Sequence, residues 1–519
     1  MFKTLANAWK IEELRKKLLF TLMIILLYRI GVAITVPFVS AELVSEQVAV
    51  LGGIGGLFST LSSGFEYASL FALGVSPYIT ASIVVQLLSV AIPSLERLAK
   101  QGEEGKQKIT VITRYITIGI SLIMAIGYYF MISGALIKDS WYVAFLIVAC
   151  FCAGSALVMW LAEKINEKGI GNGISIILFA NIVSRGLSIL NDFIGKVENI
   201  YYGDPNIAGA LDTYESYESI YTSLGLTYDP VAYKETLMNS VENPWGFRIT
   251  SILVLLLTTI GILALIWFVV FISDSERRIP VQYAKKVVGR KMYGGRNTNL
   301  PLKVNMAGVM PVIFANAILS IPGMIFQFIN TSYDEYASSG YSAYYTLDEY
   351  CLATTGAEAS FVAEMDAFFS NTASWFFLLM TFILILAFAY FYVSISFNPV
   401  EVAGNLQQNG GSIPGIRPGK PTAMFIKKVL SKVTFIGALC LSVVAILPTL
   451  VYLILNGIGG IELESGTSAV LTALQGRTSM IGDFVNCGTS IIIVVGVVLE
   501  TVRDMEAQMT MRHYKGFLD

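Results

Sequence analysis

The sequence predicts an all-α polytopic membrane protein with ten transmembrane helices. Of its 519 residues, 55% are hydrophobic and only 14% are charged, whereas soluble domains are about 25% charged. Apolar stretches of about 20 residues, the length that crosses a bilayer as a helix, recur along the whole chain. Twenty-eight of the 35 Lys and Arg residues lie in alternate gaps between these stretches. The bilayer is therefore expected to be the main solvent of this protein.

Ten stretches have the length and the apolar character of a membrane span. In order, they cover about residues 18–37, 67–91, 110–134, 141–162, 173–194, 248–272, 304–329, 372–396, 433–455 and 482–502. The first is too long for a signal peptide and lacks a small-residue cleavage site, so we expect it to be retained. Ten crossings return the chain to the side on which it started.

The charges between the spans orient the chain. Cytoplasmic segments retain Lys and Arg, and basic residues concentrate before the first span, in alternate gaps after it, and after the last span. By contrast, segments 196–247 and 330–370 hold eight and seven acidic residues, with two basic residues and none respectively. The sequence thus predicts a cytoplasmic arm (1–17), a cytoplasmic tail (504–519) and two acidic outer loops.

The residue types needed for several kinds of chemistry are missing from the sequence. The single histidine, His513, leaves no partner for a Ser/His/Asp or Cys/His site and no His-ligated metal. The five cysteines form neither a metal-ligand spacing nor an evident disulfide framework. Gly419-Lys420 is followed by Pro421, so no phosphate-binding loop of the ATPase type occurs. We expect no cofactor, no metal and no ATPase within the chain itself.

Two other classes of membrane protein, a symporter and an intramembrane enzyme, need ionisable groups at membrane depth. An ion-coupled symporter normally carries midplane carboxylates, and none occurs here. Only Arg29 and Arg185 lie well inside a predicted span. For Arg29 we favour a packing contact with a neighbouring helix or backbone carbonyl over a transport role. For Arg185 we favour a side chain that extends toward the outer surface.

A glycine-rich segment separates the first two spans on the predicted outer side. It is too short to cross the membrane, and unpaired backbone is not stable in lipid. Two interpretations remain open: an ordinary outer loop, or a re-entrant half-helix that fills a cavity. Its short apolar piece consists of Ile54, Leu57, Phe58 and Leu61, and the surrounding glycines are Gly52, Gly53, Gly55, Gly56 and Gly64.

Glycine and proline occur together in the second and seventh spans. Gly74 precedes Pro77, and Gly308 precedes Pro311, by three residues in each case. Such pairs can mark helices that bend or move apart, although they are also ordinary in membrane helices.

Two cytoplasmic loops, about 274–303 and 397–428, are long enough to project from the membrane. The first carries eight basic residues. In the second, Arg417 lies within the Pro- and Gly-rich turn 414–419, which we expect to hold its side chain on a stiff tip. Exposed basic loops commonly reflect topology and attraction to anionic lipid. When clustered this densely, they can also bind RNA phosphate or an acidic protein.

Several runs of sequence are specific enough to compare with known families. They are YRIG at 28–31, FALGVSPYITASIVVQLL at 71–88, ERLAKQGEEGKQKI at 96–109, GIGNGISIILFANI at 169–182, NLPLKVNMAGVMP at 299–311, FNPVEVAGNLQQNGG at 397–411, PGIRPGKPT at 414–422 and RHYKGFL at 512–518. Together and in this order, these runs resemble the SecY family, the channel subunits of the bacterial protein-export translocon. The resemblance covers nearly all of the spans and inner loops.

The resemblance implies two five-helix halves, 18–195 and 248–503, around a central pore. A short plug half-helix at about 53–65 would close this pore from outside, and a lateral gate would open between the second and seventh spans. The aliphatic pore ring would consist of Val75, Ile79, Leu178, Ile182, Ile313 and Ile493. Polar residues near the gate would be Thr80, Gln86 and Asn305, which would hydrogen-bond across it when it is shut. For Gln86, local helix packing is an equal alternative.

The resemblance also implies the activity and the partners. The chain would be a non-enzymatic channel that passes unfolded secretory polypeptides across the bacterial plasma (inner) membrane. It would also release signal sequences and membrane helices sideways into the lipid bilayer. Arg290, Lys291 and Arg417 would dock the ribosome, through its rRNA, or the SecA ATPase. The small membrane subunits SecE and SecG would accompany it.

Two features depart from the family pattern. The acidic outer segments 196–247 and 330–370 are longer than the family usually has and match none of its motifs. Arg185 has no counterpart in the corresponding motif. The resemblance assigns no role to these segments or to Arg185.

Overall fold

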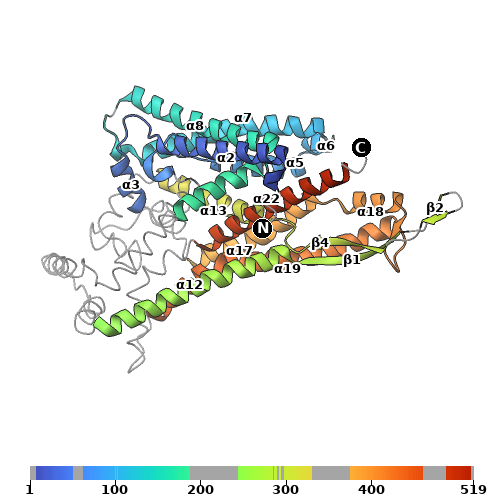
Figure 1. Cartoon of the computed structure of the whole chain (residues 1–519). Helices are drawn as coiled ribbons and strands as arrows, with labels where there is room; N and C mark the ends of the chain where they lie inside the picture. Colours follow the sequence, from blue (N-terminus) through green and yellow to red (C-terminus); the bar gives the residue numbers. More distant parts are fainter. Residues whose placement is uncertain are drawn as a thin grey trace.

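The computed structural model of the chain is mostly helical (Figure 1). It describes residues 8–50, 62, 64–99, 101, 103–138, 140–186, 244–283, 286–288, 291–293, 297–329, 374–459 and 487–515. The α-helices include α2 (Glu12–Ala33), α3 (Ala41–Val50), α5 (Ser76–Ala91), α6 (Pro93–Ala99), α7 (Glu103–Met131), α8 (Trp141–Lys168), α12 (Pro244–Asp274), α13 (Met310–Ile329), α17 (Trp375–Ser396), α18 (Pro399–Gln408), α19 (Lys420–Gly459) and α22 (Cys487–Lys515). A further helix covers Gly173–Gly186, and two short 3-10 helices are η1 (Phe65–Tyr67) and η2 (Ser133–Ala135).

The apolar helices fall where the sequence predicts spans. Four helical stretches of the described residues are long and apolar enough to cross a membrane: Gln107–Met131, Trp141–Lys168, Trp375–Gln408 and Lys420–Val451. Shorter apolar helices cover Ser76–Ala91, Gly173–Gly186, Thr259–Asp274 and Met310–Pro322. Each of these stretches overlaps a predicted span. The prediction of a mostly helical protein with apolar spanning helices is confirmed.

Two of the helices begin later than predicted, and glycine explains why. α5 begins at Ser76 and α13 at Met310, because Gly74 and Gly308 adopt the left-handed backbone conformation, with φ of 52° and 65°. A right-handed helix cannot continue through such a residue. Pro77 then lies in the first turn of α5, where its missing N–H breaks no helical hydrogen bond. The Gly–Pro pairs therefore mark helix starts in this conformation, and the ability of these helices to move apart stays a prediction.

The helices pack in two groups that share a core. Figure 1 shows α2, α7 and α8 on one side and α12, α17 and α19 on the other. α13 packs against α5 and α7 as well as against α17, so it joins the two groups. The largest cluster of buried apolar side chains draws on both groups, with members such as Ile24, Leu178, Leu265, Ile385 and Leu441. Because lipid is as apolar as these side chains, close packing rather than exclusion of water holds such helices together.

Several contacts hold the segment that connects α2 to α5 in place. Isolated β-bridges join Thr35 to Ser69 and Val39 to Leu136. The hydroxyl of Tyr128 on α7 donates a hydrogen bond to the carbonyl of Phe65 in η1. The Tyr128 ring also packs against the Phe65 ring, with 4.6 Å between ring centroids. The residues that precede α5 are therefore held on α7 although they form no long helix.

The strands lie at one end of the helix group that contains α12, α17 and α19 (Figure 1). β1 (Glu276–Tyr283) is the centre of a three-stranded antiparallel sheet with the order β4-β1-β5. β4 (Asn297–Lys303) pairs along β1 from Glu276↔Lys303 to Gln282↔Asn297. β5 (Gly411–Ser412) pairs with the end of β1. β2 (Lys286–Val288) and β3 (Lys291–Tyr293) form a separate hairpin.

Candidate functional site

The six aliphatic residues assigned to the pore ring come together in one hydrophobic cluster. Five of them are 0–2% exposed, and Ile182 is partly buried against the same cluster. They come from the start of α5, the Gly173–Gly186 helix, the first turn of α13, and α22. We call the set the aliphatic centre: Val75, Ile79, Leu178, Ile182, Ile313 and Ile493. Side chains from these four elements therefore belong to one buried apolar cluster, and their role as a pore ring stays a prediction.

Both α5 and α13 begin at the aliphatic centre. Val75 is the N-cap residue of α5, and its carbonyl accepts a hydrogen bond of 3.0 Å from the Ile79 amide. Val309 precedes α13 in the same way, and its carbonyl accepts a bond of 3.3 Å from the Ile313 amide. The two helix starts thus present Ile79 and Ile313 from equivalent positions.

A glycine lets α22 approach the start of α13. Gly496 lies three residues after Ile493, about one helical turn, and a Cβ added to it would lie 2.1 Å from Cγ2 of Val309. A residue without a side chain is needed where two elements approach so closely. This contact holds the part of α22 that carries Ile493 against the start of α13.

The residues assigned to the lateral gate hydrogen-bond within their own helix or not at all. The Thr80 hydroxyl donates to the carbonyl of Ser76 at 3.0 Å, and the Gln86 amide donates to the hydroxyl of Ser82 at 3.2 Å. The buried Oδ1 of Asn305 has no hydrogen-bond partner among the described residues. α5 does pack against α13, the pair of helices that would form the gate. In this conformation, however, none of the three side chains bonds across that interface, and their roles at the gate stay predictions.

Arg29 makes the backbone contact that its position in a span suggests. Its guanidinium donates a hydrogen bond to the carbonyl of Ala180 in the Gly173–Gly186 helix. A hydrogen bond from a charged donor offsets part of the large penalty of placing a guanidinium in an apolar environment. The interpretation of Arg29 as a contact with a neighbouring helix is confirmed.

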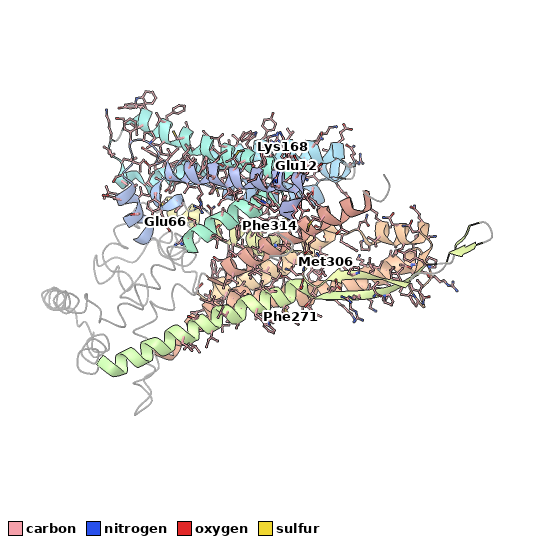
Figure 2. All side chains as sticks on the ribbon, viewed as in Figure 1. Glu12, Glu66, Lys168, Phe271, Met306 and Phe314 are labelled. Atoms are coloured by element: carbon pink, nitrogen blue, oxygen red, sulfur yellow. The ribbon has the colours of Figure 1, made fainter. Side chains whose placement is uncertain are left out.

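Arg185 forms an ion pair that the sequence does not reveal. Its Nη1 atom lies 3.2 Å from Oε1 of Glu66 in η1, and both side chains are about one third exposed. Figure 2 shows Glu66 toward one end of the helix group that contains α2, α7 and α8, away from Glu12 and Lys168. Arg185 therefore has a specific partner, which the prediction of a side chain that extends toward the outer surface did not include.

The predicted plug residues Gly53 to Phe58 lie outside the described residues. The chain just after them is anchored, because the Ser62 hydroxyl donates to the carbonyl of Phe71 at 2.9 Å. Gly64 is packed so closely that an added Cβ would lie 2.0 Å from Oγ of Ser69. These contacts therefore hold the chain in place between the predicted plug residues and α5.

The two predicted cytoplasmic loops form a single folded unit. Gln282 of β1 pairs with Ser412 of β5, and Tyr283 pairs with Gly411, so backbone bonds connect the first loop to the second. Beneath the sheet, apolar side chains from both loops and from α19 form one cluster that includes Ile279, Val281, Leu302, Ile413 and Ile426. The two predicted loops therefore share a sheet and an apolar cluster, a contact that the sequence does not predict.

Arg417 lies exposed on a turn that other residues hold in place. Gly415 and Gly419, which flank it, have φ of 79° and 98°, a conformation that glycine adopts without strain. The hydroxyl of Thr422 in the first turn of α19 donates to the carbonyl of Arg417 at 2.8 Å. The expected stiff tip is thus present. Of the other two docking candidates, Lys291 begins β3, and Arg290 lies outside the described residues.

The base of the sheet is tied to α12 and α22 by charged groups. Arg503 of α22 donates to the carbonyl of Ser273 at 2.6 Å and to the carboxylate of Asp274 at 2.9 Å. Burial lowers the pKa of Lys303 in β4, and the positive charge of Arg503 lowers it further. Asp274 and Glu276 act in the opposite direction on that pKa. Charged groups of α12, α22 and β4 therefore gather where the sheet joins the helices.

Sequence reasoning missed the sheet and the Arg185–Glu66 pair. Buried and exposed residues alternate along the second half of β1, at Ile279, Pro280, Val281 and Gln282, and this period of two is a strand signal. No local pattern could have paired Glu66 with Arg185, because the two residues belong to separate elements.

Comparison with known proteins gives concordant results. The family model described as SecY matches residues 69–502. A protein translocase subunit SecY from Streptomyces coelicolor is 36% identical to this chain over 534 aligned residues, with 100% of both proteins covered. Among solved structures, "The structure of a protein conducting channel" matches with a TM-score of 0.54 and 17% identity, covering 95% of this chain and 92% of that chain. A second, "Sec61 in the Canine ribosome-channel complex from the endoplasmic reticulum", matches with a TM-score of 0.50 and 16% identity, also covering 95% and 92%.

The structural similarity supports the fold, and the sequence similarity identifies the family. The matched region contains all six residues of the aliphatic centre. The S. coelicolor relative exceeds one third identity along its entire length. From the family model and the full-length relative together, we conclude that this chain belongs to the SecY family.

Proposed function

We propose that this chain is the protein-conducting channel subunit of a Sec translocase in a bacterial plasma membrane. It passes unfolded secretory polypeptides across the membrane and releases signal sequences and membrane helices sideways into lipid. The observation that carries this proposal is the aliphatic centre, in which six apolar side chains from α5, the Gly173–Gly186 helix, α13 and α22 belong to one buried cluster. Membership of the SecY family supports the same activity.

The physical basis of the activity is an apolar constriction. A constriction lined by aliphatic side chains tends to lose its water, so it resists the passage of ions and water. The same side chains offer a passing polypeptide no hydrogen bond or ion pair that it must break. The aliphatic centre would therefore seal the resting channel without binding its substrate.

The proposed architecture has ten transmembrane helices in two five-helix halves, 18–195 and 248–503, with both termini in the cytoplasm. The segment at about 53–65 acts as a plug on the outer side. Helices α5 and α13, which pack against each other, form the lateral gate. A hydrophobic segment leaves through that gate because it partitions into lipid by its own apolar character.

The folded unit of β1, β4, β5 and α18 acts as the docking surface for the ribosome or for SecA. Arg417 on its stiff tip and the basic pair Arg290 and Lys291 contact phosphate or acidic side chains there. The similar Sec61 channel is part of a ribosome-channel complex, which supports a ribosome partner for this chain. The chain itself is not an enzyme, so translation or the ATPase cycle of SecA supplies the energy. SecE and SecG complete the complex.

A crosslinking experiment tests the proposal. A photo-reactive amino acid is placed at Ile79, Ile182 or Ile313, and a polypeptide is stalled halfway through export. We expect crosslinks from all three positions, and none from a matched probe at Ile383, which is exposed on α17. Crosslinks from Ile383 alone, or from no position, would contradict a polypeptide path through the aliphatic centre.

A further inference from the structure

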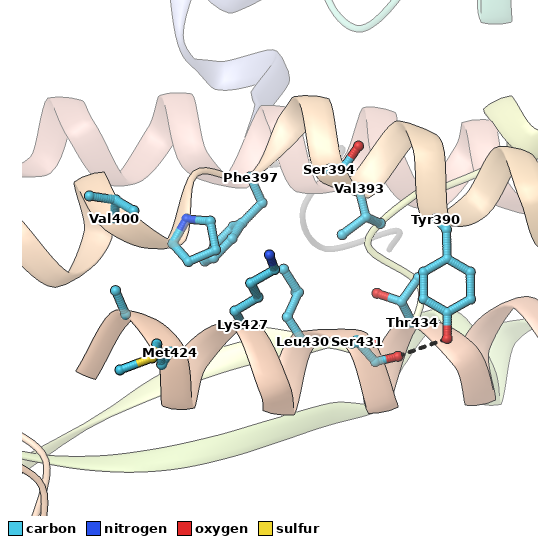
Figure 3. Close-up of a pocket in the computed structure, with 12 residues that line it drawn as sticks. Tyr390, Val393, Ser394, Phe397, Val400, Met424, Lys427, Leu430, Ser431 and Thr434 are labelled. Carbon is cyan, nitrogen blue, oxygen red and sulfur yellow. Dashed lines mark hydrogen bonds between the residues drawn. The ribbon is translucent and has the colours of Figure 1, made fainter. Parts of the chain in front are cut away.

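A half-open pocket of about 410 Å³ lies between α17, α18 and α19 (Figure 3). Its size falls within the range of about 300–1,000 Å³ typical of small-molecule sites. Val393, Phe397 and Leu430 form its apolar walls. From α19, Lys427 contributes a charged side chain and Thr434 a polar one. The Tyr390 hydroxyl, which donates to the carbonyl of Ser431 at 3.2 Å, bridges α17 and α19 at one end. The pocket is separate from the aliphatic centre, and it adjoins the proposed docking surface through α18.

One buried polar group in this pocket lacks a partner. The Thr434 side chain is 4% exposed, and its Oγ1 atom makes no hydrogen bond within the structure. Figure 3 shows this oxygen directed between the two helices. A buried hydroxyl without a partner destabilises a protein by about 1–3 kcal/mol. Such groups are rare unless something binds them. This hydroxyl is therefore available to a ligand that offers an acceptor.

The charge of the pocket is positive. Lys427 is exposed and forms no ion pair with a described residue, and Figure 3 shows its ammonium directed toward Phe397 at the mouth. None of the residues that line the pocket is acidic. Lys420, Lys428 and Lys432 on the same part of α19 add to the positive potential. An anionic group is thus favoured at the mouth, and an apolar group is favoured along the walls.

The surroundings indicate that the ligand comes from the bilayer. Both α17 and α19 are long and apolar enough to span a membrane. Apolar side chains lie exposed on the two helices beyond the pocket, among them Ile383, Ile395, Phe435, Ile436 and Leu439. At the mouth, Val400 and Met424 are 70% and 65% exposed. A surface of this kind is covered by lipid, and a pocket that opens onto it is reached from the lipid side.

We propose that this pocket binds one anionic phospholipid. The phosphate lies at the Lys427 ammonium, an ester carbonyl accepts the hydrogen bond of the Thr434 hydroxyl, and an acyl chain lies along Val393, Phe397 and Leu430. Thr434 follows Lys427 by seven residues, or about 10 Å along the helix. A lipid that extends from its headgroup into its acyl region covers such a distance. A partner helix, about 10–12 Å wide with its side chains, fits less well into a pocket that the Tyr390–Ser431 contact bridges.

The test measures lipid binding to the full chain, purified with its partner subunits in detergent, by native mass spectrometry. Phosphatidylglycerol, phosphatidylcholine and inorganic phosphate are titrated separately. We expect Lys427→Gln to weaken phosphatidylglycerol binding about fivefold, which corresponds to the ~1 kcal/mol that one basic residue contributes near an anionic surface. The matched control Lys428→Gln removes the same charge from a neighbouring exposed residue that does not line the pocket. It should leave binding nearly unchanged.

The hydroxyl is tested independently of the charge. Thr434→Val should weaken binding of both lipids about two- to tenfold, the factor that corresponds to one hydrogen bond, whereas Thr434→Ser should retain it.

Equal losses for Lys427→Gln and Lys428→Gln would show general surface attraction and overturn the site. Binding of inorganic phosphate as tight as that of phosphatidylglycerol would also overturn it. The site would also be overturned if the Lys427→Gln complex lost a partner subunit while its lipid binding stayed intact. The inference rests on the membrane placement of α17 and α19 and not on export, so lipid binding is measurable in a chain that exports nothing.

Discussion

Arg185 and Glu66 form an ion pair that connects two parts of the chain on the predicted outer side. Their Nη1 and Oε1 atoms are 3.2 Å apart. Arg185 lies in the last turn of the Gly173–Gly186 helix, which carries two residues of the aliphatic centre. Glu66 lies in η1, directly after the segment proposed to form the plug. The pair thus ties the end of that segment to one wall of the proposed channel.

A double-mutant cycle measures this connection. Arg185→Gln and Glu66→Gln should each lower the free energy of unfolding slightly. Their coupling should be about 0.2–1 kcal/mol, because both side chains are partly exposed and solvent screens the pair. Thermal unfolding in detergent at low and high salt provides the measurement, and the coupling should shrink as salt rises. Additive losses at low salt would mean that the pair makes no net contribution.

Polar substitution in the aliphatic centre should make the resting channel leak. Ile79→Asn or Ile313→Asn places an amide where only apolar side chains now meet, so water can enter and ions can follow. Conductance of the closed channel in planar bilayers should rise, and selection of signal sequences should relax. Ile79→Leu and Ile313→Leu keep the volume and apolar character, so they serve as matched controls. If the Asn variants conduct no more than the Leu variants, the aliphatic centre is not the seal.

Reversal of the charge on the stiff tip should weaken docking. Arg417→Glu is expected to reduce SecA-driven export more strongly than membrane insertion of the chain itself, because it replaces an attraction with a repulsion at an exposed contact. Export of a secretory precursor into inverted vesicles measures the effect. Lys10→Glu reverses an exposed charge in the amino-terminal arm and provides the control. Normal export by the Arg417→Glu variant would remove the docking role of this residue.

A methyl group at Gly496 should disturb the contact between α22 and α13. An added Cβ would lie 2.1 Å from Cγ2 of Val309, so one element must shift, and overpacking of this kind destabilises by about 1–3 kcal/mol. Gly496→Ala should therefore lower the thermal unfolding temperature. Gly119→Ala on α7 is the matched control, because an added Cβ there meets nothing within 4 Å. Val309→Ala should rescue the Gly496→Ala variant, and failure to do so would mean that another contact is limiting.

Much of the fold could be predicted because solvation by lipid acts locally along the chain. Every residue of a spanning helix must be compatible with the bilayer, so apolar stretches and basic gaps carry the information without knowledge of any long-range contact. Arg417 is a similar case. The glycines and prolines that shape its turn are its immediate neighbours, and the structure holds it on an exposed tip with left-handed glycines on both sides.

The aliphatic centre was predictable only through the family resemblance. Aliphatic residues spaced by four positions are common in membrane helices, so the sequence alone does not distinguish Ile79 from many others. The helix starts were missed for a related reason. Gly74 and Gly308 are compatible with a bent helix or with a helix start, and their left-handed torsion angles depend on what packs around them.

By itself, then, the sequence determined the class of protein, the positions of the apolar helices and the family, because these depend on composition and on runs of adjacent residues. Only the tertiary structure decided that Arg29 bonds to Ala180, that Arg185 pairs with Glu66, and that β1 joins β5. It also brought Lys427 and Thr434 of α19 into one pocket with α17. The physical reason is that these contacts join elements distant in the chain. Their partners are chosen by packing geometry, which no local pattern of residues encodes.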